Sequence, residues 1–409
     1  MKEALYIVDT LNKNGYKAYF AGGWVRDHLL NHPSADIDIA TDAPSNIVQK
    51  LFKKTIPIGV KFGIILVIVD NKQYEVATFR TDVSYEDGRR PSQVKFSTPD
   101  EDAKRRDFTI NGMFYDPIKK EIIDFVNGKI DLEAKIIKAI GDPNQRFLED
   151  RLRMIRAIRL SSRFSFKIDK ETKIAISKHS KDLFPSVAIE RVMQEFQKMS
   201  LYKGFRNSLI KMFEVNLLQT IFPSLKELSI DEIKKRTLII EGFPKETPVI
   251  ISILELFKNI SLEEKIEISK YLKISNREID FVKFIHLSKE FIVDFKNIDD
   301  YTWSLFFTSK YSEIAQDILA MYIPAIDRIA FFEKLNNKKE ELKYFINKIK
   351  NKDPILKSEH LKLYNINPGL LMGQLLKDAE KISINKKIKE PHKVIEELKK
   401  TKLWPKESL

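Results

Sequence analysis

The sequence predicts an α+β fold: an N-terminal head with a small mixed sheet and helices, followed by an all-helical neck, body and tail. Strand-like segments, whether alternating or continuously apolar, occur only in about the first 135 residues. After Gly141–Pro143, apolar residues recur at intervals of three and four, which is the spacing of amphipathic helices. We therefore expect four parts: a head (1–138), a neck (139–200), a body (201–300) and a tail (301–409).

The first half of the head is expected to alternate strands and helices. Residues 16–20 predict a short strand that ends before the glycine pair Gly22-Gly23, and residues 24–30 have the apolar spacing of a helix. Residues 35–40 (ADIDIA) alternate polar and apolar side chains with a period of two, as in a strand that is buried on one face.

The second half of the head predicts a hairpin. Residues 62–70 form an apolar run typical of a buried strand, Asn71-Lys72 is expected to turn, and residues 73–80 return as the partner strand. Residues 84–92 are polar, contain glycine and proline, and are expected to form a loop. Beyond the head, the apolar spacing over residues 146–164 predicts one strong helix.

The composition excludes several classes of protein. The 409-residue chain contains no cysteine, which excludes disulfides, thiolate catalysis and cysteine-ligated zinc or iron–sulfur centres. Its N-terminus lacks the apolar core of a signal peptide, and no apolar run reaches the roughly 18 residues of a membrane span. We therefore expect a cytoplasmic protein with no membrane contact. The formal charge of +13 favours a polyanionic partner.

The positive charge is distributed unevenly along the chain. Residues 1–150 hold 22 basic and 23 acidic residues, so this part is nearly neutral. Residues 151–200 hold 12 basic and 5 acidic residues, a net of +7, and residues 201–409 hold 37 and 30, again +7. A single segment of fifty residues thus carries about half of the surplus, and it begins within the helix expected over 146–164.

Asp36 and Asp38 form a carboxylate pair. In a strand they project to the same face, while Ile37 and Ile39 point into the core. Two neighbouring carboxylates repel unless a cation neutralises them, and Mg²⁺ prefers such oxygen ligands together with water and substrate phosphates. Glu75 offers a third carboxylate on the expected partner strand. A solvated strand edge is the common explanation of an isolated pair of this kind.

The glycine pair before these carboxylates makes their functional interpretation more specific. Gly22-Gly23 between a strand and a helix lets a phosphate approach the backbone, and Arg26 adds a positive charge in the first helical turn. This pair, a spacer of twelve residues and the Asp-Ile-Asp segment together resemble the nucleotidyltransferase superfamily that includes DNA polymerase beta. The resemblance implies two-metal transfer of a nucleotidyl group, in which one metal activates an attacking hydroxyl and both stabilise the triphosphate charge.

Further motifs narrow the family. Three segments are similar to the class II tRNA nucleotidyltransferases and the bacterial poly(A) polymerases: AGGWVRDHLL (21–30), KRRDFTING (104–112) and LEDRLRMIRAIRL (148–160). Two more resemble later segments of the same family, AIERVMQEF (188–196) and NPGLLMGQLLKDAE (367–380). The resemblance therefore extends through the head, the middle and the tail of the chain.

Asp150 and Arg153 are candidates for reading the incoming base. Three apart in the expected helix, they share a face, and a carboxylate beside a guanidinium presents acceptors next to donors. Cytosine and adenine carry an amino donor beside a ring-nitrogen acceptor, whereas uracil and guanine carry a carbonyl and an N–H. The pair can therefore select CTP and ATP without a nucleic acid template, as the family is understood to do. A solvated or phosphate-binding basic helix is the alternative.

The resemblance also implies roles for other residues. Arg156 and Arg159 continue at steps of three toward the triphosphate or the base. Arg106 matches the family's arginine at the nucleotide, where a guanidinium fork suits phosphate oxygens. Gly23 and Arg26 carry over as nucleotide contacts.

Two segments help to distinguish the poly(A) polymerases of this family from its CCA-adding members. Poly(A) polymerases of this family usually carry a basic, aromatic stretch where this chain has residues 56–69, which look instead like the CCA-adding form. The segment YEDGRRP (85–91) matches the flexible loop that the family needs to change specificity from CTP to ATP. Its presence argues against an enzyme that adds only CC, and it leaves open one that adds only the terminal A.

These features predict a template-independent enzyme that adds CCA to tRNA 3′ ends from CTP and ATP. Asp36 and Asp38 are expected to bind Mg²⁺, with Glu75 as a third catalytic carboxylate. The body and tail are expected to hold the acceptor arm of tRNA by shape and phosphate contacts. The alternatives are a poly(A) polymerase or A-only enzyme of the same family and an inactive RNA-binding regulator. The oligomeric state is left open.

Overall fold

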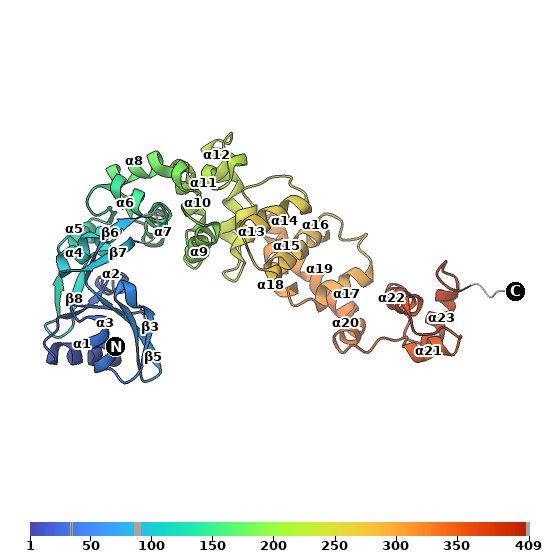
Figure 1. Cartoon of the computed structure of the whole chain (residues 1–409). Helices are drawn as coiled ribbons and strands as arrows, with labels where there is room; N and C mark the ends of the chain where they lie inside the picture. Colours follow the sequence, from blue (N-terminus) through green and yellow to red (C-terminus); the bar gives the residue numbers. More distant parts are fainter. Residues whose placement is uncertain (33, 35, 86–90, 406–409) are drawn as a thin grey trace. The chain divides into compact units, whose positions relative to one another are not determined.

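The computed structural model describes residues 1–32, 34, 36–85 and 91–405. The chain divides into two compact units, Met1–Leu238 and Ile239–Leu409. The first unit contains the sheets together with helices, and the second is helical (Figure 1). The predicted α+β head followed by a helical remainder is therefore confirmed, while the finer division into four parts stays a prediction.

The main sheet of the first unit has seven strands in the order β3-β4-β5-β2-β1-β8-β9. Their bounds are β1 (Ala18–Ala21), β2 (Asp38–Thr41), β3 (Thr55–Gly59), β4 (Ile64–Val69), β5 (Lys72–Thr78), β8 (Phe114–Asp116) and β9 (Glu121–Ile123). β2 pairs antiparallel with β1 and parallel with β5. In this register Asp38 lies opposite Ala21 and beside the β5 segment that carries Glu75. The sheet thus brings together two carboxylates that are far apart in the sequence.

The alternating pattern around β2 behaves as predicted. Ile37 and Ile39 are buried, whereas Asp36 and Asp38 are exposed. The strand itself begins only at Asp38, so Asp36 precedes it.

The predicted hairpin forms between β4 and β5. Its turn is one residue earlier than expected, because Asp70 and Asn71 adopt positive φ angles of 48° and 60°. This conformation at both central residues is typical of a type I′ turn, and asparagine and aspartate tolerate it well.

Helices and a second ribbon complete the head. α1 (Lys2–Lys13) and α3 (Ser45–Leu51) pack against the sheet, and Ile7, Leu11 and Ile39 are fully buried there. The other elements are α2 (Gly23–Leu29), η1 (Val60–Phe62), α4 (Pro99–Lys104), η2 (Thr109–Asn111) and α5 (Gly128–Glu133). β6 (Arg80–Tyr85) and β7 (Pro91–Phe96) pair antiparallel. Of the loop expected over 84–92, residues 86–90 lie outside the described residues, and the flanking residues belong to these strands because they pair with one another.

The rest of the first unit is mainly helical. β10 (Ile136–Ile137) and β11 (Lys167–Ile168) form a short parallel pair. The helices are α6 (Pro143–Glu149), α7 (Leu152–Phe164), α8 (Lys170–His179), η3 (Ser180–Asp182), α9 (Ile189–Ser200), α10 (Phe205–Glu214), α11 (Leu217–Ile221), η4 (Pro223–Leu225) and α12 (Ile230–Arg236). A 3₁₀ helix, η5 (Leu238–Gly242), follows α12 in the sequence.

The single helix expected over 146–164 is wrong. Asp150 has extended backbone angles (φ −144°, ψ 104°) and separates α6 from α7. Its Oδ1 accepts a hydrogen bond of 3.0 Å from the backbone N–H of Leu152. An aspartate that binds a nearby backbone N–H competes with helix continuation and favours a new helix start.

The second unit consists of helices around two apolar clusters. Trp303 is fully buried and stacks on Phe291 at 4.4 Å between ring centroids, whereas a separate cluster around Leu375 and Val394 forms the C-terminal part. The elements are α13 (Val249–Leu254), α14 (Leu262–Tyr271), α15 (Asn276–Ser288), α16 (Glu290–Val293), α17 (Asp300–Thr308), α18 (Ser312–Ala320), η6 (Ala325–Asp327), α19 (Arg328–Glu341), α20 (Lys343–Lys350), α21 (Ser358–Lys362), α22 (Leu370–Asn385) and α23 (Pro391–Lys399). Among the helices that the structure describes, none is long and apolar enough to span a membrane.

Candidate active site

One pocket of about 510 Å³ in the first unit gathers the predicted site residues. Its walls come from β1, β2, β5, α2, α7, α9 and the segment that follows α4. Nine of the ten residues selected from the sequence line it: Gly23, Arg26, Asp38, Glu75, Arg106, Asp150, Arg153, Arg156 and Arg159. The tenth, Asp36, is exposed just before β2 and close enough to raise the pKa of Asp38 by its charge. Their individual roles stay predictions.

The pocket is cationic. Seven arginines line it, against four acidic residues: Arg26, Arg105, Arg106, Arg153, Arg156, Arg159 and Arg191 face Asp38, Glu75, Asp107 and Asp150. Every cation in this lining is a guanidinium, whose planar fork binds phosphate and carboxylate oxygens in pairs. Such a lining suits a ligand with several phosphate groups.

The negative charge of Asp38 is only partly compensated by Arg106. Protein atoms around it displace water, although its side chain remains open to the pocket. This loss of hydration and the charges of Glu75 and Asp36 raise the pKa of Asp38 to about 6, against the opposing charge of Arg106. A cation bound at Asp38 would therefore be favoured.

Gly22 allows the close approach of backbone and side chains at this end of the pocket. Its φ of +67° is a left-handed conformation that glycine adopts without strain. A Cβ atom here would lie 3.0 Å from Nη1 of Arg106 and 3.9 Å from Oδ2 of Asp38. The glycine at this position thus leaves room for the arginine beside the carboxylate.

The donor set fits a magnesium ion that is only partly held by protein. Among the described residues, no cluster of three or more His, Cys, Asp or Glu side chains is arranged to bind a metal. Mg²⁺ commonly uses one or two carboxylates and completes its shell with water and substrate phosphates. The oxygens of Asp36 and Asp38 match that kind of site.

Buried acidic and amide groups fix the arginines in place. Arg26 is only 4% exposed, and its Nε and Nη2 donate to Oδ1 of Asp27 at 2.9 and 2.7 Å. Its Nη1 donates to Oδ1 of Asn111, and its guanidinium lies over the ring of Phe164. Arg163 Nη2 binds the second oxygen of Asp27 at 3.0 Å. The charge of Arg26 is therefore held at one position.

Asp102 orients two neighbouring arginines. It is 1% exposed, with Arg105 on its Oδ1 at 2.6 Å and Arg106 on its Oδ2 at 3.0 Å. Burial alone would raise the pKa of Asp102, but the charges of Arg106 and Arg105 lower it overall. The guanidinium of Arg106 also lies 4.9 Å from the ring centroid of Phe114. These contacts direct Arg106 toward the pocket.

Two further ion pairs hold the arginines of α7. Arg156 donates through Nε and Nη2 to Oδ2 of Asp107 at 2.8 and 2.5 Å. Arg159 Nε lies 2.6 Å from Oε2 of Glu195, which is 1% exposed on α9. Burial would raise the pKa of both carboxyls, but the arginines lower it. Both pairs connect α7 to other elements around the pocket.

Replacing the buried Asp107 with asparagine is expected to lower the free energy of unfolding by about 2 kcal/mol, because the charge-assisted bonds to the half-buried Arg156 are weakened. Since the pKa of Asp107 is depressed in the folded state, its contribution is present above the unfolded pKa of about 3.9 and is lost as the pH falls further. Urea denaturation at neutral pH and near pH 3 measures the free energy of unfolding. The difference in this free energy between wild type and variant should be smaller at the lower pH. Equal differences at both would contradict the prediction.

Asp150 and Arg153 both line the pocket, and each has a charged side-chain partner of its own. Oδ2 of Asp150 lies 3.5 Å from Nη2 of Arg191. Arg153 is 8% exposed, and its Nη1 donates to Oε2 of Glu149 at 2.7 Å and to the carbonyl of Arg146 at 3.1 Å. The shared face of one helix is thus replaced by Asp150 at the helix break and Arg153 in the first turn of α7.

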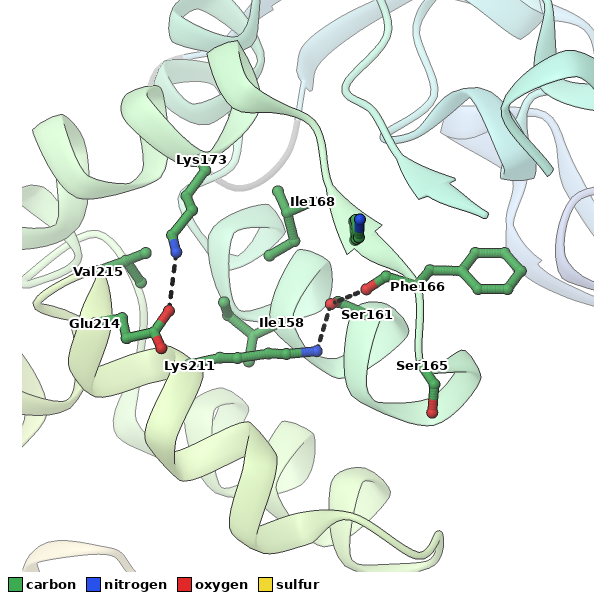
Figure 2. A pocket seen from close by; sticks show the side chains of 10 residues that line it. Ile158, Ser161, Ser165, Phe166, Ile168, Lys173, Lys211, Glu214 and Val215 are labelled. Carbon is green, nitrogen blue, oxygen red and sulfur yellow. Dashed lines mark hydrogen bonds and ion pairs between the residues drawn. The ribbon is translucent and has the colours of Figure 1, made fainter. Parts of the chain in front are cut away.

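Two hydrogen bonds of Ser161 anchor the C-terminal end of α7, as Figure 2 shows. Ser161 Oγ donates to the carbonyl of Phe166 at 2.5 Å and accepts a hydrogen bond of 2.8 Å from Nζ of Lys211 on α10. A lysine near a helix C-terminus also interacts favourably with the helix dipole. Ser165 then ends the helix with a φ of 57°. These contacts fix the helix that carries three of the pocket arginines.

The residues that orient the charged side chains of the pocket were not predicted from the sequence, namely Asp27, Asp102, Asp107, Arg191 and Glu195. Asp102 stands three and four residues before the arginines that it binds, a helical spacing that gives a local signal. The pairs between Arg159 and Glu195 and between Arg163 and Asp27 join residues 36 and 136 positions apart. No local pattern in one sequence reveals such distant pairs.

Two segments of the chain match known families. Residues 18–138 match the poly(A) polymerase head domain, and residues 165–228 match a domain described as the probable RNA and SrmB-binding site of polymerase A. With the arginine-lined pocket and the carboxylates on β2 and β5, these matches define a nucleotidyltransferase.

The relatives identify the family within this class. The CCA-adding enzyme of Pediococcus pentosaceus is 33% identical over 391 residues, which cover 95% of this chain and 94% of that enzyme. The CCA-adding enzyme of Enterococcus faecalis is 43% identical over 227 residues, 55% of each chain. The structure of the Bacillus stearothermophilus CCA-adding enzyme in complex with CTP is similar with a TM-score of 0.79 at 26% identity, covering 97% of both chains. The chain belongs to the family of CCA-adding enzymes.

Proposed function

We propose that this protein adds CCA to the 3′ ends of tRNAs from CTP and ATP, without a nucleic acid template and with release of pyrophosphate. The observation that carries the proposal is the single pocket in which two strand carboxylates meet seven arginines. Relatives along nearly the whole chain are CCA-adding enzymes, and one similar structure contains CTP. These relatives favour CCA addition over poly(A) synthesis.

In this proposal the arginines of the pocket bind the triphosphate, with Arg106 and Arg26 nearest to the carboxylate end. Asp150 and Arg153 read the base edge, and Arg156 and Arg159 lie along the same wall. Five of the seven guanidiniums are already oriented by a buried carboxylate, so little of their side-chain freedom is lost when the nucleotide binds.

The reaction forms a bond between the tRNA 3′-oxygen and the α-phosphorus of the nucleotide. The bond from that phosphorus to the bridging oxygen breaks, and pyrophosphate leaves with the electron pair. The hydroxyl proton is lost in the same step, and in this proposal it goes to Glu75, which lines the same pocket. The arginines stabilise the negative charge that develops on the phosphate oxygens.

We propose that Asp36 and Asp38 hold Mg²⁺. When bound, the ion supplies Lewis-acid stabilisation of phosphate charge and lowers the pKa of the attacking hydroxyl. Within this scheme residues 1–138 form the catalytic head and 139–200 the neck that selects the nucleotide. Residues 201–300 and 301–409 form a body and a tail that hold the acceptor arm of tRNA. Because the substrates are tRNA, CTP and ATP, we place the protein in the cytoplasm.

Incubation with defined tRNAs tests the function. A tRNA transcript that lacks CCA, and a second that ends in CC, are each incubated with labelled CTP, ATP, UTP or GTP, singly and together. We expect two C and one A on the first transcript and one A on the second, with no further addition. Long A tails would favour a poly(A) polymerase, and addition of A to the second transcript alone would favour an A-only enzyme.

A further inference from the structure

Asn111 joins two charged groups in the wall of the pocket. Among the described residues that line this pocket, it is the one whose side chain is polar but uncharged. It ends η2 and is 8% exposed. Its amide oxygen accepts a hydrogen bond from Nη1 of Arg26, and its amide nitrogen donates to Oδ1 of Asp107 at 3.0 Å. One side chain thus connects a cation on α2 to an anion in the segment that follows α4.

The chemistry of the two partners requires an amide between them. A guanidinium carries donors alone, and an ionised carboxylate carries acceptors alone, so the group between them must both accept and donate. This fixes the orientation of the amide, with its oxygen toward Arg26 and its nitrogen toward Asp107. A carboxylate of the same size at position 111 would accept from Arg26 but would repel Asp107. The position is therefore specified by its hydrogen bonds more closely than by its volume.

The two partners of the amide lead to two points of α7. On one side, Oδ2 of Asp107 binds Arg156 at 2.8 and 2.5 Å. On the other side, Arg26 binds Asp27, whose second oxygen binds Arg163 at 3.0 Å. The amide thus completes a continuous series of side-chain bonds between α2, the segment after α4 and α7. Arg26 and Arg156 both line the pocket, so the series connects two of its cations.

The backbone around Asn111 is closely packed. Its N–H donates to the carbonyl of Phe108 at 2.8 Å, and its own carbonyl accepts from Nη1 of Arg106 at 3.3 Å. A Cβ atom at Gly128 would lie 2.2 Å from the carbonyl oxygen of Thr109, so α5 lies directly against η2. The amide is therefore carried by a backbone segment that has little room to move.

We propose that Asn111 is a positioning residue that fixes Arg26 and Arg156 relative to each other for nucleotidyl transfer. This inference rests on the proposed function, which assigns both arginines to the nucleotide. Burial would raise the pKa of Asp107, but the charge of Arg156 and the hydrogen bond from Asn111 lower it, so the amide also helps to keep Asp107 ionised. A misplacement of about 1 Å can cost roughly a hundredfold in rate, so loss of this connection should act on kcat.

The test exchanges the two side-chain types. N111D removes the donor toward Asp107, and D107N leaves a single side-chain oxygen for Asn111 and Arg156. Each variant alone should lower kcat for both CTP and ATP roughly 10- to 100-fold. In N111D/D107N the carboxylate at position 111 accepts from Arg26 and from the amide at position 107, whose oxygen accepts from Arg156. Its kcat should be roughly tenfold above that of either single variant. Recovery stays partial because the Phe108 N–H loses its carboxylate acceptor.

The matched control is N14D, the same substitution at an exposed asparagine that follows α1 and does not line the pocket. It should keep the wild-type kcat. The KM for tRNA should stay at the wild-type value in all variants, whereas a general loss of structure would change it. Thermal unfolding shows that each variant is folded at the assay temperature.

A wild-type kcat in folded N111D would overturn the positioning role, and so would a double variant with no higher kcat than the single variants. If the wild-type protein binds labelled CTP but extends no transcript, the proposed function fails. The positioning role is then judged by the affinity for CTP, which should fall roughly tenfold in N111D and recover in the double variant. An unchanged affinity in N111D would overturn it.

Discussion

Replacing Asp38 with asparagine is expected to lower the incorporation of both CTP and ATP at least roughly a thousandfold. The substitution removes the carboxylate at the head of β2 that lines the pocket and carries the raised pKa. A bound metal contributes several kcal/mol to charge stabilisation in phosphoryl transfer, which corresponds to this factor in rate. Because an amide occupies the same space, binding of tRNA should remain close to wild type. Single-turnover incorporation and filter binding measure the two effects.

The control for this experiment is Asp9→Asn, which removes an exposed carboxylate from α1 that pairs with Lys13. It should leave incorporation unchanged. Asp36→Asn should resemble Asp38→Asn, because both carboxylates are assigned to the same ion. Incorporation at more than a tenth of the wild-type rate in Asp38→Asn would contradict the metal-binding role.

Much of the head could be predicted because its signals are local. The alternation around Ile37 and Ile39 identified the buried face of one strand, and the apolar run before Asp70 identified the hairpin. The order of the strands could not be predicted in the same way. It depends on pairings such as that of β1 with β8, whose register joins Phe20 to Tyr115. Contacts between residues so far apart in the sequence depend on packing in three dimensions, and they produce no periodic pattern in a single sequence.

The same contrast between local signals and distant contacts applies to the candidate site. Motifs within a few residues of each other identified the residues that face the pocket, such as Arg106 and Arg156. The partners that orient these arginines were missed where they come from other elements, as Glu195 does for Arg159. The helix break at Asp150 was also missed, because the apolar spacing continues across it while one side-chain hydrogen bond changes the backbone.

This break affects how the base is read. Asp150 lies at the helix break and Arg153 lies in α7, so different partners orient the two side chains. Arg191 lies beside Asp150, and Glu149 binds Arg153. The remaining Glu149 oxygen pairs with Arg146 at 2.8 Å. The pair that is proposed to select the nucleotide is therefore held by residues at the end of α6 and on α9, and its geometry depends on the packing of these helices.

Arg153→Ala is expected to relax nucleotide selection. The variant loses the guanidinium donors beside Asp150, while Glu149 keeps Arg146 as a partner, so no unpaired charge is left at the end of α6. A pair of directed hydrogen bonds to a base contributes about 1–3 kcal/mol to discrimination, so the ratio of kcat/KM for CTP over UTP should fall roughly 10- to 100-fold.

Arg153→Lys should lose most of the same discrimination, because an ammonium keeps the charge but lacks the planar fork. Arg151→Ala is the matched control, since Arg151 stands two residues earlier and does not line the pocket. It should keep the wild-type ratio, and thermal unfolding of all three variants shows whether the fold is intact. If Arg153→Ala folds normally and still rejects UTP as wild type does, then base selection resides in other groups of the pocket, with Arg191 beside Asp150 as the next donor to replace.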